Sequence, residues 1–447
     1  MKLKNLSINT EFELYGYWYF SKQLPKKFSG ILTKNSESIM LKIYIDSINI
    51  EELTHDFDYF YGMTEYGEKI TCRKLVYMGS KFGSSIPNVS YIIQEIYVGD
   101  FINNNTQFNS ITLSFDFLNK WIKKGIRLDS ENKLKDIKNY PKDTYIINQD
   151  LKLQDSIAYV ERLSSTKYEY LIEKNLKLSF INKCNLSDVR LNFYKINLFL
   201  NIFFNKFIVF NQIYLVTEEK KKIYKIFNQD IDKKFHDNKS VIFYEEVKSY
   251  LESSLTKWFS NFPIYYTLSS NIIKSNSHVY DLKAYYAELI RNIETYHREF
   301  IENNFEEKQL IDEDKRKLVK FIEREVENNI YFMDRIKYTT EKVSFRERIE
   351  STLDSFPDRF KEEISNYHNK KNNTQRGIKR NIKSYTNFLT DFRNDYIHNN
   401  VLDESEIFER NENLFEETAM LKKYLRYLIL FELGIDEKLL IKEDYYY

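Results

Sequence analysis

The sequence predicts an α+β protein, with a β-rich N-terminal part followed by an all-α C-terminal bundle. Through the first 125 residues, short runs alternate apolar and polar residues, and Gly, Asn, Ser and Pro separate these runs, as in strands. After residue 279 apolar residues recur every three or four positions, as in amphipathic helices. At 447 residues the chain is long enough for two or three domains.

The N-terminal part has its clearest strand in ESIMLKIYIDSI, where Ile39, Leu41, Ile43 and Ile45 share one face. Further strands are expected in KLVYMG, VSYIIQEIYVG and FNSITLSFDF. The apolar stretch 189–219 fits buried strands or a buried helix, and its pattern does not decide between them. The following segment, 238–262, predicts a strand and then a helix that ends near Trp258.

A polar stretch at 269–278 predicts the boundary between two domains. The first would span 1–268, with a division into 1–125 and 126–268 as an alternative, and the second would span 279–447. In the second, Ser344 and Glu347 predict a helix-capping box, and Pro357 should end that helix. Gly434 should follow the end of the last long helix.

Composition excludes several classes of function. Net charge is +1, so any nucleic-acid contact must come from a local patch. Two distant cysteines predict neither a disulfide framework nor a zinc site, which fits a reducing cytoplasm. Neither a signal peptide nor a membrane span is expected. The usual phosphate-binding and dinucleotide-binding glycine motifs are absent, and we expect no cofactor and no metal site.

The string TDFRNDYIHNN places Arg393 five residues before His398 on a predicted helix. A permanently charged guanidinium can stabilise a pentacoordinate phosphate, and an imidazole can take or give a proton, so the pair can cleave RNA without a metal. At about 100° per residue, Leu389, Phe392 and Tyr396 form an apolar stripe. The residues on the arc turned away from that stripe are Arg393, Asn394, Ile397 and His398. A site completed by a second protomer would suit this arrangement.

A second match to the Arg-His pattern, Arg291 with His297, has a simpler interpretation. It lies on a helix with a full apolar stripe and with Glu294 and Arg298 nearby, so a packed or ion-paired surface explains it. The first match gains weight from a basic, polar stretch that precedes it, with no acidic residue between Glu363 and Asp391. The candidate RNA-binding residues there are Lys371, Arg376, Lys379, Arg380 and Lys383.

The C-terminal part resembles the ApeA-like group of HEPN domains. The resemblance rests on RNDYIH (393–398), ETYHR (294–298) and SFRERIESTL (344–353). The N-terminal part resembles the matching ApeA N-terminal domain in GYWYF (16–20), SGILT (29–33), YMGSKFG (77–83), VSYIIQEIYVGDFI and FNSITLSFDFLNKWI (108–122). Gly16 and Gly30 are interpreted as turn glycines, and Trp18 and Trp121 as sheet-packing residues.

This resemblance implies a metal-independent endoribonuclease of bacterial anti-phage defence. HEPN nucleases typically dimerise so that two Arg-His motifs form one site, which implies a homodimer or a higher even oligomer. His398 would act as general base or acid, Arg393 would stabilise the transition state, and Asn394 would orient the histidine or a phosphate. The N-terminal domain would sense infection or restrain the nuclease, and a phage protein is a candidate trigger. tRNA is one candidate substrate, and the products would be a 2′,3′-cyclic phosphate and a 5′-hydroxyl.

Two alternatives remain open. Some HEPN domains are catalytically silent and serve as binding or dimerisation modules. Others are toxins of toxin-antitoxin pairs that are neutralised by nucleotide transfer to a tyrosine near the motif. Tyr396 lies inside the motif, although its place on the apolar stripe favours a packing role.

Overall fold

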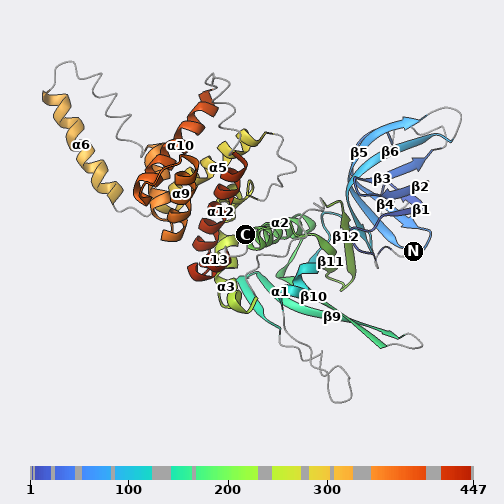
Figure 1. The fold of residues 1–447 in the computed structure, drawn as a ribbon. Helices are drawn as coiled ribbons and strands as arrows, with labels where there is room; N and C mark the ends of the chain where they lie inside the picture. Colours follow the sequence, from blue (N-terminus) through green and yellow to red (C-terminus); the bar gives the residue numbers. More distant parts are fainter. Residues whose placement is uncertain are drawn as a thin grey trace, which may run out of the picture. The chain divides into compact units, whose positions relative to one another are not determined.

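The computed structural model describes residues 3, 6–21, 26–45, 53–81, 86–122, 142–163, 168–229, 244–272, 281–302, 307–325, 344–398 and 414–443. Side chains at 116, 120, 157–163, 168–173, 307–315, 396–398 and 441–443 lie outside this description. The chain forms two compact units, Met1–Ser260 with Leu433–Tyr447, and Asn261–Glu432. All described strands belong to the first unit, and the described elements of the second are helices (Figure 1). The predicted α+β class is therefore confirmed, while the predicted domain limits stay predictions.

Six antiparallel strands of the first unit form a closed ring. They are β1 (Phe12–Tyr19), β2 (Phe28–Lys34), β3 (Ile39–Tyr44), β4 (Phe57–Thr64), β5 (Lys69–Lys81) and β6 (Asn88–Val98). The order around the ring is β1-β2-β3-β6-β5-β4, and β4 pairs with β1 to close it. β3 meets the N-terminal half of β6, with Met40 opposite Ile92. The four predicted core positions of the β3 region, from Ile39 to Ile45, are all buried, so that prediction is confirmed.

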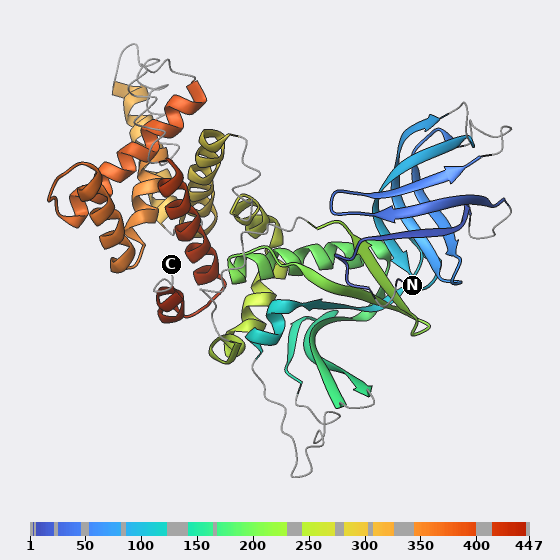
Figure 2. The ribbon, with the colours of Figure 1, turned by 45° about the vertical axis from the view of Figure 1, so that its right-hand side comes forward.

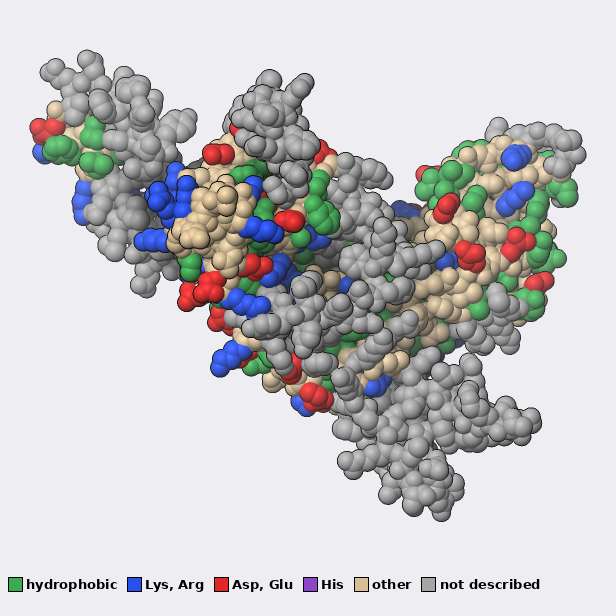
Figure 3. Space-filling model, viewed as in Figure 1, with side chains coloured by type: hydrophobic (Ala, Val, Ile, Leu, Met, Phe, Trp, Pro, Cys, Tyr) green, Lys and Arg blue, Asp and Glu red, His purple; other side chains and the backbone are tan. Residues whose placement is uncertain are grey.

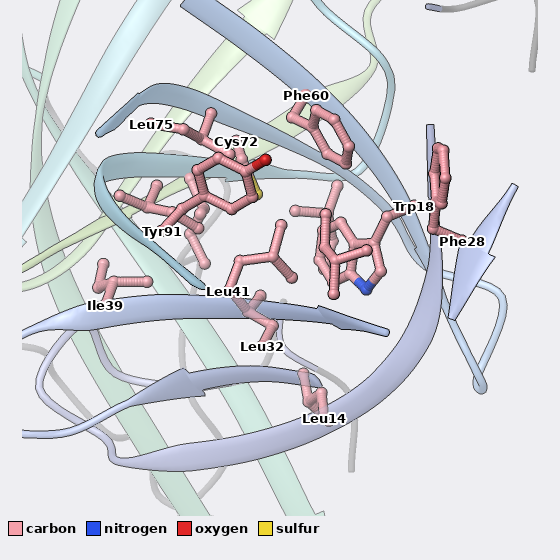
Figure 4. Packing of buried hydrophobic residues seen from close by; sticks show 14 of the residues in the cluster. Leu14, Trp18, Phe28, Leu32, Ile39, Leu41, Phe60, Cys72, Leu75 and Tyr91 are labelled. Carbon is pink, nitrogen blue, oxygen red and sulfur yellow. The ribbon is translucent and has the colours of Figure 1, made fainter. Parts of the chain in front are cut away.

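The inside of the ring is filled by large apolar side chains, among them Trp18, Phe60 and Tyr91 (Figure 4). Gly16 and Gly30 are opposite each other within β1 and β2, so the expectation of turn glycines is wrong. Their role is close approach. A Cβ at Gly30 would lie 2.8 Å from Cδ1 of Trp18, and a Cβ at Gly62 would overlap the same indole. The packing role of Trp18 and Trp121 is confirmed by their burial.

A second antiparallel sheet continues from the ring through the C-terminal half of β6. Its strands are β7 (Phe108–Phe115), β8 (Thr144–Asn148), β9 (Leu151–Leu163), β10 (Tyr168–Cys184), β11 (Phe210–Thr217) and β12 (Lys222–Phe227), in the order β12-β11-β7-β10-β9-β8. β6 is shared because Val98 is opposite Tyr224 of β12 as well as Ile70 of β5. The helices of this unit are α1 (Asp116–Trp121), α2 (Leu186–Phe204), α3 (Tyr244–Ser260) and α13 (Glu437–Glu443).

The stretch 189–219, which the sequence left undecided, contains most of α2 and then β11. Asn185 caps α2 by accepting a hydrogen bond from the Asp188 amide at 3.0 Å, and Asn205 ends it in a left-handed conformation with φ 52°. Phe204 at its end packs edge-on against Trp121 of α1, with ring centroids 4.9 Å apart. The expected helix near Trp258 is α3, whereas the strand expected before it lies outside the described residues.

A buried ion cluster joins the ring, the second sheet and α2. Glu95 of β6 is 2% exposed and is contacted by Arg73 at 2.8 Å, Arg190 of α2 at 2.8 Å and Lys225 of β12 at 2.6 Å. Burial alone would raise the pKa of the Glu95 carboxyl, but Lys225 and Arg190, with a hydrogen bond from Tyr97, hold this pKa at about 2. One carboxylate therefore forms ion pairs with cations from three different elements.

The second unit is a helical bundle (Figure 2, olive to red). Its elements are α4 (Phe262–Ser269), α5 (Leu282–Tyr296), the π turn η5 (His297–Ile301), α6 (Glu307–Glu325), α8 (Phe345–Asp354), α9 (Asp358–Lys371), α10 (Ile378–His398) and α12 (Leu414–Glu432). The predicted capping box of Ser344 and Glu347 starts α8, and α8 ends before Pro357. Gly434 follows α12 with φ 87°, which confirms its predicted place. No described helix combines the length and apolarity that crossing a membrane requires.

Candidate nuclease site

Arg393, Asn394 and His398 all lie on α10, near its C-terminal end. One face of this helix is buried in the bundle through Ile382, Tyr385, Leu389 and Phe392. The Phe392 ring meets Tyr286 of α5 edge-on, with centroids 4.8 Å apart. The predicted apolar stripe is therefore confirmed at Leu389 and Phe392. The side chains of Tyr396, Ile397 and His398 lie outside the described residues, so their predicted places and roles stay predictions.

Arg393 is half-buried and is held by two contacts. Its guanidinium carbon lies 4.7 Å from the ring centroid of Phe345, the first residue of α8. Its Nη1 donates a hydrogen bond to Oδ1 of Asn394 at 3.2 Å. Its Nε is buried and has no hydrogen-bond partner within the part of the chain that the structure describes. Two of the three predicted catalytic residues, Arg393 and Asn394, are therefore hydrogen-bonded to each other.

The helix α8, which begins with Phe345, is tied to Glu294 of α5 and to Glu302, which follows η5, by buried ion pairs. We call Glu294, Glu302 and Arg348 the Arg348 network. Arg348 is 5% exposed, and its Nη1 lies 2.8 Å from Glu294 while its Nε lies 3.3 Å from Glu302. Nδ1 of His297 lies 3.9 Å from the same Glu302 oxygen. The motifs ETYHR and SFRERIESTL, which are about fifty residues apart in the sequence, thus meet in one network.

The second Arg-His match does not form a pair of neighbouring functional groups. Arg291 is exposed on α5, whereas His297 is 3% exposed and begins the π turn. Burial lowers the pKa of His297 against the opposing effect of Glu302. Arg298 pairs with Glu294 at 2.5 Å. The interpretation as a packed or ion-paired part of the helix is confirmed for His297, which is packed, and for the neighbouring Glu294 and Arg298, which are ion-paired.

All five candidate RNA-binding residues are exposed, and four of them, Arg376, Lys379, Arg380 and Lys383, lie where α10 begins. On an ideal helix Lys379, Lys383 and Arg380 lie about 40°, 80° and 140° around the axis from Arg393, all on the side away from the core stripe. Lys383 lies about 15 Å from Arg393 along the axis. Figure 3 shows Lys and Arg side chains gathered over the α9 and α10 part of the bundle. We call Lys379, Arg380 and Lys383 the basic face.

The fifth candidate, Lys371, has a different environment. Its ammonium lies 2.8 Å from Glu417 of α12, a carboxylate that is 2% exposed and also accepts a hydrogen bond from Tyr367. Its ammonium is therefore already paired with a buried carboxylate, although Lys371 itself is exposed. The connection between Lys371 and α10 is ordered by Asn369, whose Oδ1 accepts hydrogen bonds from the Arg376 amide at 2.8 Å and from Asn381 at 3.0 Å.

Sequence reasoning missed Phe345 and the ion-pairing role of Arg348. The capping box predicted where α8 begins. No feature of the sequence near Phe345 indicates that this first residue of α8 would contact Arg393, about fifty residues later. It also missed His368, a buried imidazole in α9 whose pKa burial lowers to about 4, with Lys371 and Arg376 acting in the same direction. Among the described residues there is no group of three His, Cys, Asp or Glu side chains placed to hold a metal.

The fold and this site define a β-rich domain joined to a HEPN-type helical bundle. Residues 13–275 match ApeA N-terminal domain 1, and residues 287–439 match the Apea-like HEPN family. The first match alone spans more than half of the chain, so the chain belongs to the ApeA family. No curated protein and no solved structure matched it. At the level of the family, these matches support a HEPN-type nuclease that acts in defence.

Proposed function

We propose that this chain is a metal-independent endoribonuclease of bacterial anti-phage defence. The observation that carries the proposal is the environment of Arg393. Its half-buried guanidinium packs over the ring of Phe345, and the outer side of the same helix carries the basic face. The basic face would receive the phosphate backbone of an RNA, with tRNA as one candidate. The N-terminal unit would sense infection, with a phage protein as trigger, or would restrain the nuclease until then.

The proposed reaction is a transesterification within the RNA. The ribose 2′-oxygen attacks the adjacent phosphorus, the bond to the 5′-oxygen breaks, and a 2′,3′-cyclic phosphate and a 5′-hydroxyl result. His398 takes the proton of the 2′-hydroxyl or gives one to the leaving oxygen. Arg393 donates to the phosphoryl oxygens as negative charge builds up in the transition state. Asn394, which accepts a hydrogen bond from Arg393, would orient the histidine or the phosphate.

The proposed active assembly is a homodimer or a higher even oligomer of the helical unit. On an ideal helix position 397 lies about 40° from Arg393 and on its outer side, so an apolar residue stands among the polar ones of the motif. Such a residue is expected where a symmetric partner packs. Replacing Ile397 by Asp would then weaken association and cleavage together.

Mixing two inactive variants tests this shared site. Arg393→Ala chains and His398→Ala chains should each cleave RNA poorly, and mixing them should restore part of the activity. Mixed dimers keep one arginine and one histidine, on different protomers. Each variant mixed with a second preparation of itself is the control. A wild-type protein that sediments as a monomer at every concentration and still cleaves RNA would contradict the shared site.

The basic face makes a separate prediction about RNA affinity. Replacing Lys379 or Lys383 by Ala should weaken RNA binding, because each lysine would neutralise a backbone phosphate and release its counterion. The slope of log affinity against log salt should fall by about 0.7–0.9 for each lysine removed. Fluorescence anisotropy across a salt series measures this. Lys248→Ala on α3, an exposed lysine of the other unit, is the matched control. An unchanged slope in both variants would remove the basic face from the site.

A further inference from the structure

The ring of Phe345 packs against the guanidinium of Arg393. The ring centroid lies 4.7 Å from Cζ, within the range of a cation–π contact. A ring over the plane of a guanidinium leaves the N–H edge available for hydrogen bonds. In Arg393, Asn394 uses Nη1 on that edge, and the neighbouring Nε is buried without a partner among the described residues. The contact therefore holds the guanidinium against the ring, and one of its donors is already used by Asn394.

The structure also shows what holds Phe345 in place. Phe345 and Arg348 are three residues apart on α8, so they project from neighbouring positions of one helix face. Arg348 is anchored by Glu294 on α5 and by Glu302, which follows the π turn. The capping box of Ser344 and Glu347 fixes the turn from which Phe345 projects, with the Ser344 amide donating to Glu347 at 2.7 Å. The start of α8 is thus fixed both by its cap and by the Arg348 network.

We propose that Phe345 is a positioning residue for Arg393. The Arg348 network fixes α8 and thereby determines the position of the Phe345 ring. This inference rests on the proposed function, in which Arg393 stabilises the transition state. An unsupported arginine has four rotatable side-chain bonds, and ordering it during the reaction would cost conformational entropy. If the ring already holds the guanidinium before the substrate binds, this entropy is not lost when the transition state forms. Phe345 should therefore affect kcat more than KM.

Three substitutions at one position test the role of the ring. Phe345→Tyr keeps the aromatic face and should stay close to wild type. Phe345→Leu keeps an apolar side chain but loses the ring, and Phe345→Ala loses both; these two should lower kcat by about 10–100-fold with little change in KM. Equal activity of the Leu and Tyr variants, whether both high or both low, would overturn the proposal. Arg348 is less suitable for this test because removing it leaves buried carboxylates that can unfold the domain.

A double-mutant cycle separates positioning from a general loss of structure. In an Arg393→Ala background, Phe345→Leu should lower the residual cleavage by less than about twofold, because the group that it positions is already gone. A structural defect at α8 would lower the residual activity as much as it lowers that of the wild type. Additive effects of the two substitutions would therefore contradict the proposal.

A spectroscopic signature tests the contact without using activity. In protein labelled with ¹⁵N-arginine, the Nε–H signal of Arg393, identified by its loss in Arg393→Lys, should show a ring-current shift. The shift should persist in Phe345→Tyr and disappear in Phe345→Leu. A signal that does not change in the Leu variant would refute the contact. A wild-type protein that shows the signature but cleaves no RNA would refute the proposed function and leave the contact established.

Discussion

Replacing His398 by Ala is expected to reduce RNA cleavage by about 10²–10⁴-fold, the range that positioned acid–base catalysis supplies. The reason is chemical. Alanine has no group that can take the proton of the attacking 2′-hydroxyl or protonate the leaving oxygen. Single-turnover cleavage of a labelled RNA by purified protein measures the loss. Protection of cells in a phage-plaque assay should be lost together with cleavage.

Two other histidines serve as controls for this result. His55→Ala removes an exposed imidazole of the N-terminal unit and should leave both the fold and cleavage unchanged. His297→Ala opens a cavity beside the Arg348 network and should lower thermal stability, while the chemistry in the folded fraction stays largely intact. Full cleavage by purified His398→Ala protein would remove His398 from the mechanism.

Replacing Glu95 by Gln should lower the free energy of unfolding of the N-terminal unit by about 3–5 kcal/mol. The substitution removes the anion on which Arg73, Arg190 and Lys225 converge, and leaves these cations close together, with Arg73 and Lys225 largely shielded from water. Adding Lys225→Met to Glu95→Gln should recover part of this loss, because the most buried of the three cations is then gone. Asp58→Asn, which breaks an exposed pair with Lys74 in the same ring, is the matched control and should cost less than about 1 kcal/mol.

Tryptophan fluorescence can follow this effect in one unit. The chain has three tryptophans, Trp18, Trp121 and Trp258, and all lie in the first unit. Urea unfolding followed by selective excitation of tryptophan therefore reports on that unit while the helical unit contributes little. A Glu95→Gln variant that unfolds at the same urea concentration as the wild type would show that the cluster does not stabilise the unit.

The same carboxylate predicts a pH dependence of stability. The pKa of Glu95 is about 2 in the folded protein, below its ordinary value of 4.5. A group with a lowered folded pKa stabilises the protein above its unfolded pKa, and this contribution is lost as pH falls. The wild type should therefore lose about 3 kcal/mol between pH 4.5 and pH 2 through Glu95 alone. The gap between wild type and Glu95→Gln should shrink over the same interval.

Local patterns in the sequence predicted the elements that depend on local physics. Alternation placed Ile39, Leu41 and Ile43 on the buried face of β3, because a pleated strand turns every second side chain inward. Helical spacing placed Leu389 and Phe392 in the core, because residues three or four apart share a helix face. The capping box at Ser344 and the glycine after α12 were likewise read from the chemistry of helix ends.

The features that depend on distant contacts could not be predicted in this way. Strand β6 pairs with β3 through its first half and with β12 through its second, and no local signal shows that one strand serves two sheets. The sequence suggests a turn glycine at Gly30, because it does not show that the indole of Trp18 leaves no room for a side chain there. The stretch that became α2 is apolar nearly all round, so its periodicity could not separate a helix from a strand.

At the candidate site, the sequence identified Arg393, Asn394 and His398 by residue type and spacing, and it marked the basic face by the absence of acidic neighbours. It could not identify Phe345, because the contact joins residues 48 positions apart, from Phe345 to Arg393, across two helices. Nor could it separate Lys371 from the other basic residues, because the buried Glu417 that pairs with it comes from α12. The chemical role of each candidate residue could be predicted from its type and spacing. The residue that packs against Arg393 and the residue that pairs with Lys371 could be found only from the fold.

The most direct test of the proposed nuclease is cleavage of RNA by the purified protein in excess EDTA, followed by analysis of the product ends. The account predicts undiminished cleavage by the wild type, fragments with 2′,3′-cyclic phosphate and 5′-hydroxyl ends, and no such fragments from His398→Ala. Cleavage that stops in EDTA and returns when Mg²⁺ is added back, or products with 3′-hydroxyl and 5′-phosphate ends, would contradict it.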